Sequence, residues 1–299
     1  MVGYLYCALA MVTVGSTVVA SKVIAAGLPP FTATALRFAV ALPVFLVLCW
    51  LLQARFPRFG RRDLVLLVLQ ACAGSVGYTV LLISGMSFTS AATAGVLVGT
   101  LPIVSAGFAV LALGERPTVR LLAAVALAAL GVLAASGFST VELQAPATKH
   151  LLGAALVLAA VACEALFILL NKRLRAPMEA LPLSTLMCAL GFVFASAASL
   201  FLEHPWQISM DVRALEAVLY YALVPTVLGF VLWYAGAARV SGMEAALFTA
   251  LAPVSATLLA NTILHEAITP RQLAGMACVL AAVGSLAWQP PSYGRVDAL

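Results

Sequence analysis

Long apolar runs, separated by short breaks of polar and helix-breaking residues, make up almost the whole sequence. A helix needs about 20 apolar residues to cross the hydrocarbon core of a bilayer, and the runs are of this length. The breaks include GLPP at 27–30 and RFPRFGRR at 55–62, whose residues end helices or seek water. The pattern predicts an all-α membrane protein with ten transmembrane helices, at about 3–26, 30–53, 63–84, 89–112, 118–136, 150–172, 180–202, 214–236, 242–264 and 271–288.

The composition strengthens this prediction. Of the 299 residues, 64% are hydrophobic and only 9% are charged, whereas a soluble domain has about 25% charged residues. One water-soluble core could not hold so much apolar surface, so lipid must be the main solvent of the chain. The net charge of +5 does not indicate a nucleic-acid partner, because the arginines lie in short loops and not along one face.

The sequence carries no motif of a catalytic, metal-binding or nucleotide-binding site. Its predicted spans contain no HExxH, no GxSxG, no acidic dyad and no Walker motif, and the three histidines lie at span ends. The six cysteines fall within apolar runs without metal-ligand spacing, so they are interpreted as small core residues. We therefore expect no metal, no cofactor and no enzymatic activity. The N-terminus lacks a basic n-region and a cleavage site, which favours a retained first span.

Lysines and arginines are unequally distributed between the two sets of loops, and this predicts the orientation. The loops after odd-numbered spans carry three: Lys149, Arg213 and Arg271. The loops after even-numbered spans, together with the C-terminal tail, carry eleven: Arg55, Arg58, Arg61, Arg62, Arg116, Arg120, Lys172, Arg173, Arg175, Arg239 and Arg295. Because positive residues are retained in the cytoplasm, both termini are expected there.

A pattern of polar residues and prolines occurs twice in the chain, because residues 90–132 match residues 241–283 at twelve of 43 positions. Alanine and leucine matches carry little weight here, so the other pairs matter more: Ser90/Ser241, Pro102/Pro253, Glu115/Glu266, Thr118/Thr269 and Arg120/Arg271. The members of each pair are 151 positions apart, and we call this separation the repeat offset. The chain is therefore predicted to contain two five-span halves, at 1–137 and 150–288, followed by a disordered tail at 289–299.

Because each half has an odd number of spans, the second half must enter the membrane from the opposite side. Inverted repeats of this kind are typical of secondary transporters, whose substrate site lies near the membrane midplane between the halves. Pro102 and Pro253 each lie within a predicted span, where a proline frees a backbone carbonyl and permits a kink. The two prolines either act as matched hinges for alternating access or only shape the packing.

Three stretches of sequence carry a resemblance to a known family: GSTVVASKVIAAGLPPFTATALRFAVALP at 15–43, SFTSAATAGVLVGTLPIVSAGFAVLALGERPT at 87–118 and SGMEAALFTALAPVSATLLANTILHEAITPRQLAG at 241–275. With the ten predicted spans and the inverted repeat, they resemble the EamA branch of the drug/metabolite transporter superfamily. One departure is His265 before Glu266, where the first half has Gly114 before Glu115. Within this branch, the chain is most similar to the aromatic amino acid exporters of the YddG type.

The resemblance implies a secondary transporter of the bacterial inner membrane that exports aromatic and other neutral amino acids. Transport would proceed by alternating access through a central cavity between the two repeats. The partners would be a small-molecule substrate and the lipid bilayer, and ten spans can enclose such a pathway within a monomer. The alternative is an exporter of cationic drugs, amines or another small metabolite, in which Glu164 is the cation or proton site.

Few polar side chains lie deep enough in the predicted spans to meet a substrate. Glu164 lies midway along the sixth span, where an ionised carboxylate costs at least a few kcal/mol. It either binds a substrate ammonium or a proton, or it is a protonated hydrogen-bonding group between helices. Tyr78 in the third span and Trp233 in the eighth suit aromatic substrates if they line the cavity, although both residue types are also common at membrane interfaces.

Five further polar residues have structural or substrate-binding alternatives. Thr13 and Ser16 in the first span either allow close helix packing or expose backbone carbonyls to a substrate. Asn261 in the ninth span either binds substrate or bridges to a neighbouring helix, because its amide must find a partner in lipid. Lys22 is near enough to the outer membrane surface for its ammonium to reach it. Arg37 lies deeper and is expected to be a structural charge that pairs with a carboxylate or a carbonyl.

Overall fold

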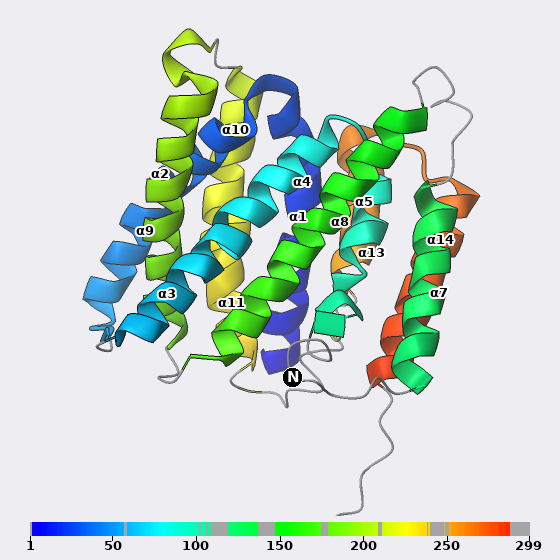
Figure 1. The fold of residues 1–299 in the computed structure, drawn as a ribbon, viewed down its shortest axis with the longest axis horizontal. Helices are drawn as coiled ribbons and strands as arrows, with labels where there is room; N and C mark the ends of the chain where they lie inside the picture. The colour runs from blue at the N-terminus through cyan, green and yellow to red at the C-terminus, as the bar shows by residue number, and fades with distance from the viewer. Residues whose placement is uncertain are drawn as a thin grey trace, which may run out of the picture.

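The computed structural model describes residues 2–56, 59–101, 103–105, 107–108, 119–136, 147–174, 179–208, 211–237, 239, 248 and 251–287. The regular elements in these residues are helices, and they lie side by side in a bundle (Figure 1). The predicted spans 89–112 and 242–264 are described in part. Pro102, Glu115 and the tail at 289–299 lie outside the described residues.

The helices follow the apolar runs along the chain. The first part forms α1 (Val2–Gly27), α2 (Pro30–Leu51), α3 (Arg61–Gln70), the π-helical segment η1 (Ala71–Gly77), α4 (Tyr78–Met86), α5 (Ala91–Val98) and α7 (Val119–Ser136). The second part forms α8 (Ala147–Lys172), α9 (Ala180–Ala198), the π-helical segment η3 (Ser199–Glu203), the 3₁₀ helix η4 (Pro205–Gln207), α10 (Val212–Tyr221), the π-helical segment η5 (Ala222–Leu228), α11 (Gly229–Ala237), α13 (Leu251–Leu264) and α14 (Pro270–Ala287).

Local chemistry accounts for several helix boundaries. Pro30 opens α2, where its fixed φ suits the first turn and its missing N–H is not needed. The Ser90 hydroxyl accepts a hydrogen bond from the N–H of Thr93 at the start of α5. The Asp211 carboxylate does the same for the N–H of Ala214 at the start of α10. His204, at a φ of 48°, ends η3 in the left-handed region.

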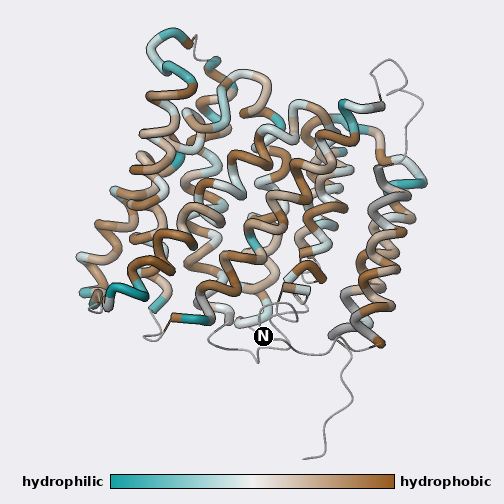
Figure 2. The backbone as a smooth tube through the Cα atoms, viewed as in Figure 1, coloured by the Kyte–Doolittle hydropathy of each residue, from teal (hydrophilic) through white to brown (hydrophobic). Residues whose placement is uncertain are grey.

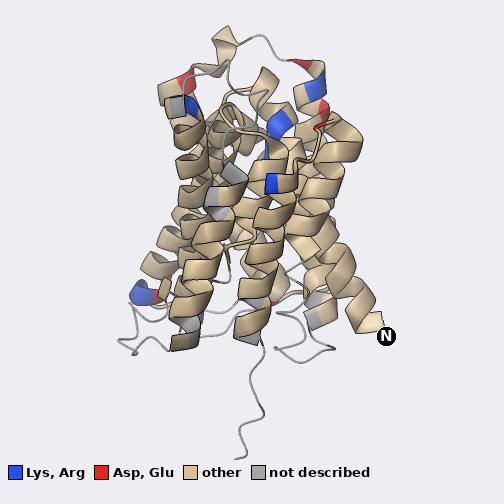
Figure 3. Ribbon diagram, turned by 90° about the vertical axis from the view of Figure 1, so that its right-hand side faces the viewer, with Lys and Arg blue, Asp and Glu red and all other residues tan. Residues whose placement is uncertain are grey.

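The described helices have the length and composition of membrane spans. Six helical runs are long and apolar enough to cross a bilayer: Val2–Gly27, Pro30–Leu51, Arg61–Met86, Thr148–Leu170, Ala180–Glu203 and Val212–Trp233. They coincide with six of the predicted spans, and shorter apolar helices at Leu122–Gly131 and Leu251–Leu264 lie within two others. Apolar residues follow the helices, whereas charged residues gather at the two ends of the bundle (Figures 2 and 3). The chain is therefore a multi-pass membrane protein.

The element boundaries recur along the chain at the repeat offset that separates the paired prolines. The succession α3, η1 and α4 begins at Arg61, and the succession α10, η5 and α11 begins one repeat offset later, at Val212. The internal boundaries match as well, because η1 and η5 are both seven residues long and begin at Ala71 and Ala222, again one repeat offset apart. The same offset relates α7 to α14 at both ends. In addition, α1 begins and α14 ends at the same face of the bundle (Figure 1).

Helices from equivalent predicted spans in the two parts of the chain pack against each other. The close pairs are α2 with α9, α7 with α14, and α5 with α13, which lie in the equivalent spans 89–112 and 242–264 without being one repeat offset apart. Two further sets of contacts correspond at the level of the predicted spans, since α1 packs on α10, α11 and α13 while α8 packs on α3, α4 and α5. Pro253 is buried in α13, and its ring lies against Gly99 at the end of α5. The largest buried cluster joins α1, α4, α5, α8 and α13 at the centre of the bundle.

Gly15 allows α1 to approach α13 at backbone distance. A Cβ atom at this position would overlap the hydroxyl of Ser255 and would lie 2.5 Å from the carbonyl oxygen of Ala252. Small residues at helix contacts are the usual means by which spans pack closely in lipid. The α1–α13 contact therefore depends on the absence of a side chain at this position.

We expect the substitution Gly15→Ala to lower the free energy of unfolding by about 1–3 kcal/mol, because the added methyl group must push the two backbones apart. The midpoint of thermal unfolding in detergent measures the effect. Gly284→Ala in α14 is the matched control, since no atom lies within 4 Å of its added Cβ. Equal midpoints for the two variants would contradict the close contact.

Candidate functional site

A cavity of about 180 Å³ lies among the central helices. One water molecule needs about 10–15 Å³ of such a cavity, so this volume holds several water molecules or one small solute. Its walls are mostly apolar, with a few polar groups that converge on it. The lining residues are Val14, Thr17, Arg37, Phe38, Gly74, Ser75, Tyr78, Thr79, Val98, Leu101, Val161, Glu164, Phe167, Ser184, Met187, Cys188, Tyr221, Pro225, Thr226 and Phe230.

Of the described π-helical segments, η1 and η5 contribute equivalent residues to this lining. Ser75 of η1 and Thr226 of η5 are separated by the repeat offset, and both line the cavity. Pro225 cannot donate a backbone hydrogen bond to the carbonyl of Tyr221 four residues earlier. The Thr226 hydroxyl donates to that carbonyl instead, at 2.9 Å. Irregular helix is thus present where it faces a cavity and where a side chain satisfies the freed carbonyl.

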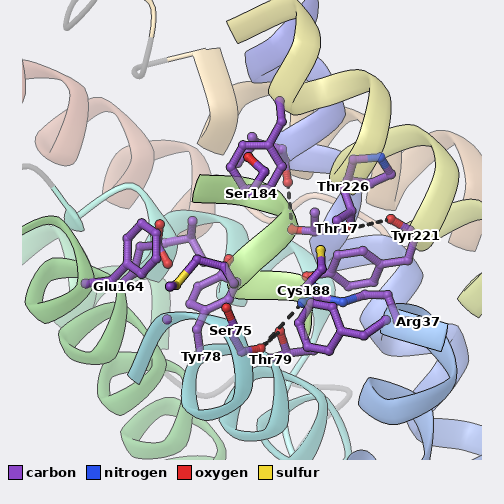
Figure 4. A pocket seen from close by; sticks show the side chains of 18 of the residues that line it. Thr17, Arg37, Ser75, Tyr78, Thr79, Glu164, Ser184, Cys188, Tyr221 and Thr226 are labelled. Carbon is purple, nitrogen blue, oxygen red and sulfur yellow. Dashed lines mark hydrogen bonds between the residues drawn. The ribbon is translucent and has the colours of Figure 1, made fainter. Parts of the chain in front are cut away.

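Arg37 is 8% exposed and projects from α2 into the cavity lining (Figure 4). Its Nη2 atom donates to the carbonyl oxygen of Ser75 at 3.4 Å. The guanidinium carbon lies 4.2 Å from the ring centroid of Phe38 and 4.7 Å from that of Tyr221, within the range of cation–π attraction. Nε has no hydrogen-bond partner among the described residues. The guanidinium is therefore held in position, and its buried Nε is left without an acceptor among the described residues.

Glu164 faces the cavity from α8, on the side opposite Arg37 in Figure 4. The side chain is half-buried, and among the described residues no hydrogen bond or ion pair engages its carboxylate. A guanidinium and a carboxylate thus meet the same apolar space without pairing directly. Tyr78 lies in the wall with its aromatic ring, as do Tyr221 and Phe230. This arrangement can bind a small molecule that carries both charges and an apolar or aromatic group.

Of the residues that the sequence suggested for the pathway, Glu164 and Tyr78 lie in the cavity lining, and Arg37 lies there with them. Thr13 and Ser16 do not, because both face neighbouring helices. The Thr13 hydroxyl lies beside Gly229 of α11 and donates to the carbonyl of Ala10 within α1 at 2.7 Å, and the Ser16 hydroxyl accepts from Tyr220 of α10 at 2.8 Å.

Trp233 and Asn261 also lie outside the lining. Trp233 packs against a small cluster of α1 and α13 residues. Asn261 is on the exposed side of α13, where its Nδ2 donates to the carbonyl of Glu266 at 2.9 Å. The amide thus finds its partner at the end of its own helix, and neither a substrate nor another helix supplies it.

Several lining residues carry no signal in the sequence that would select them. Thr17 faces the cavity where its neighbour Ser16 does not, and Ser184 lines the cavity from α9. Ser75 and Thr226 could have been found from the repeat offset, which pairs two small hydroxyl residues in two apolar spans. Tyr221 could not, because its equivalent position is Gln70.

Lys22 binds the turn between α4 and α5. Its Nζ donates to the carbonyl oxygens of Met86 at 2.8 Å and Thr89 at 2.7 Å. These carbonyls follow the end of α4, where a positive charge also interacts favourably with the helix dipole. The ammonium has a structural position outside the cavity lining.

Comparisons with known proteins give a consistent result. The EamA-like transporter family matches residues 1–137 and 151–288. An uncharacterised transporter, YetK of Bacillus subtilis, is 34% identical over 282 residues, which cover 94% of this chain and 85% of the relative. A probable terminal-alkyne amino-acid exporter of Streptantibioticus cattleyicolor is 29% identical over 247 residues, which cover 83% and 80%. One solved crystal structure has the same fold, with a TM-score of 0.65 at 19% identity over 95% of this chain and 97% of the other.

The substitution Lys22→Met should lower the free energy of unfolding by about 2 kcal/mol, because two charge-assisted hydrogen bonds are lost and two carbonyls are left without them. Thermal unfolding in detergent tests this expectation. Arg213→Met, at an exposed arginine near the same end of the bundle, serves as the control. A midpoint as high as that of the control would show that Lys22 does not stabilise the turn.

Proposed function

The chain belongs to the EamA-like transporter family, and from this premise we propose that it exports neutral amino acids with aromatic or other apolar side chains. The family and the transporters similar to this chain make it a membrane transporter and not an enzyme. The proposed substrate class is more specific than what membership of the family shows. It rests on the chemistry of the cavity.

One observation carries the proposal: the cavity presents a carboxylate and a guanidinium that do not pair with each other. The Glu164 carboxylate suits the ammonium of an amino acid, and the guanidinium of Arg37 in the same lining suits its carboxylate. The rings of Tyr78, Tyr221 and Phe230 suit an aromatic or apolar side chain. A neutral amino acid satisfies both charges at once, whereas an acidic side chain would enter an apolar wall without a partner.

The alternative is a cationic drug or amine that binds to Glu164. Arg37 argues against it, because a permanent positive charge in the same small cavity repels a ligand that brings no carboxylate. The relative named as a probable amino-acid exporter also favours an amino acid. Amines remain the second candidate, and the tests below distinguish the two.

We further propose that transport uses alternating access between two inverted halves, at 1–137 and 150–288, that together provide ten spans. The recurrence of element boundaries at the repeat offset and the packing of equivalent helices support this architecture. The common face of the start of α1 and the end of α14 supports an even number of spans. With the unequal distribution of lysine and arginine, it supports cytoplasmic termini in the bacterial inner membrane. The hinge role of Pro102 and Pro253 stays a prediction.

Uptake of radiolabelled amino acids into proteoliposomes tests the substrate class. Tryptophan, phenylalanine and threonine should enter saturably, and glutamate should not exceed protein-free vesicles. Glu164→Gln should reduce uptake of phenylalanine by about tenfold or more, because a neutral amide loses a charge-assisted hydrogen bond to the ammonium. Glu216→Gln, at an exposed carboxylate on α10, should leave uptake unchanged. If no amino acid enters, the proposal is wrong.

Competition between tryptophan and tryptamine tests the role of Arg37, because tryptamine lacks only the carboxylate. The wild-type protein should prefer tryptophan, and Arg37→Gln should weaken tryptophan binding by roughly 10–100-fold, the worth of a hydrogen bond to a charged group. Arg37→Lys should recover part of the loss, because it keeps the charge without the planar fork. Equal inhibition of the wild-type protein by the two compounds would favour the amine alternative.

A further inference from the structure

We infer that Glu203 and Glu266 form two clasps on one face of the bundle, and that their release lets the cavity open to that face. This face is the one at which α2 and α5 begin, here called the outer face (Figure 1). The inference rests on the proposed alternating access. It adds two residues, Glu203 and Glu266, that control whether the cavity opens to the outer face. Neither residue lines the cavity.

The first clasp joins the end of η3 to the start of α2. The Glu203 carboxylate accepts hydrogen bonds from the backbone N–H groups of Phe31 at 2.9 Å and Thr32 at 2.6 Å. It also accepts from the Thr32 hydroxyl at 2.7 Å, and that hydroxyl lies 2.7 Å from the hydroxyl of Ser199. A carboxylate in the first turn of a helix satisfies free N–H groups and complements the helix dipole.

The second clasp has the same chemistry and joins the loop after α13 to the start of α5. The Glu266 carboxylate accepts hydrogen bonds from the N–H groups of Ala91 at 3.2 Å and Ala92 at 3.1 Å. Gln272 of α14 donates to the Thr93 hydroxyl in the same turn, at 3.1 Å. Each clasp therefore joins a helix start in the first part of the chain to a carboxylate in the second part.

The packing explains why these two contacts control opening. In one group, α1 packs on α10, α11 and α13, and α2 packs on α10 and η5; in the other, α8 packs on α3, α4 and α5, and η1 packs on α9. The two groups meet where α2 packs on α9 and where α5 packs on α13, and the clasps lie at the outer ends of these two contacts. The cavity lies between the groups, with Arg37 in the first and Glu164 in the second. Glu203 belongs to the second group and holds α2 of the first. Glu266 follows α13 of the first group and holds α5 of the second.

Asp211 provides a matched comparison at the same face. Its carboxylate accepts from the N–H of Ala214 at 3.0 Å, so it caps the helix that it precedes and joins no two groups. If Glu203 and Glu266 were only helix caps, neutralising either of them would have the same effect as neutralising Asp211, and the cavity would stay closed to the outer face. If they are clasps, their neutralisation must also expose the cavity to the outer face.

The test uses the full chain in right-side-out vesicles, with Cys188 as the sole cysteine. Cys188 lines the cavity and is 2% exposed, and the other five cysteines are replaced by serine or alanine. A membrane-impermeant maleimide is added from the outside. Glu203→Gln and Glu266→Gln should each accelerate labelling of Cys188 by about tenfold, because each loses a charge-assisted contact that only the closed state makes. Asp211→Asn should leave the rate unchanged.

The outcomes separate this inference from the proposed function. Labelling that is no faster in the two clasp variants than in Asp211→Asn overturns the inference. Phenylalanine is added in parallel, and slower labelling of the parent protein in its presence supports the substrate proposal whatever the clasp variants do. Faster labelling in the clasp variants without protection by phenylalanine supports the clasps and contradicts the substrate class.

A cross-link provides an independent test. The hydroxyls of Thr32 and Ser199 are 2.7 Å apart, so the pair Thr32→Cys and Ser199→Cys is close enough for a disulfide across the first clasp. Oxidation should reduce transport at least tenfold, and reduction should restore it; the single-cysteine variants should not respond. Undiminished transport by the fully cross-linked protein would show that the outer ends of α2 and α9 need not separate.

Discussion

Arg37 brings a permanent charge into an apolar helical bundle, and the form of the cavity depends on how that charge is satisfied. Two aromatic faces and one carbonyl hold the guanidinium, and no carboxylate among the described residues neutralises it. An acidic partner in direct contact would have closed the cavity with an internal ion pair. Glu164 lies across the space instead, so an occupant of the cavity that pairs with both residues would have to carry an anionic and a cationic group.

The π-helical segments make this arrangement possible. A regular helix would direct every carbonyl of α3–α4 and α10–α11 along its own axis. In η1 the carbonyl of Ser75 instead accepts from both Thr79 and Arg37, and in η5 the Thr226 hydroxyl replaces the N–H that Pro225 lacks. Polar backbone in lipid is tolerated where it lines a cavity and finds a partner. The same departure from regular helix, in η1 and in η5, thus places a polar group in the cavity lining from each part of the chain.

The charges at the outer face follow the helix dipoles. Glu203, Glu266 and Asp211 bind helix starts, and Lys22 binds carbonyls after a helix end. Three of these four residues make contacts between distant parts of the chain. In this structure, groups that cap helix ends thus also join helices from distant parts of the chain at this face.

The sequence by itself determined where helices form, since runs of about 20 apolar residues have one low-energy state in lipid. It also determined the repeat offset. Because polar groups are rare in such spans, it selected Glu164 and Tyr78 as candidates for the pathway, and both lie in the cavity lining. It could not determine which face of a helix meets the cavity. Ser16 and Thr17 differ by about 100° around α1, and an almost uniformly apolar helix carries no periodic pattern that distinguishes them. Only the packing of distant helices decided that Thr17 lines the cavity, that Asn261 caps its own helix end, and that Arg37 and Glu164 face each other without pairing.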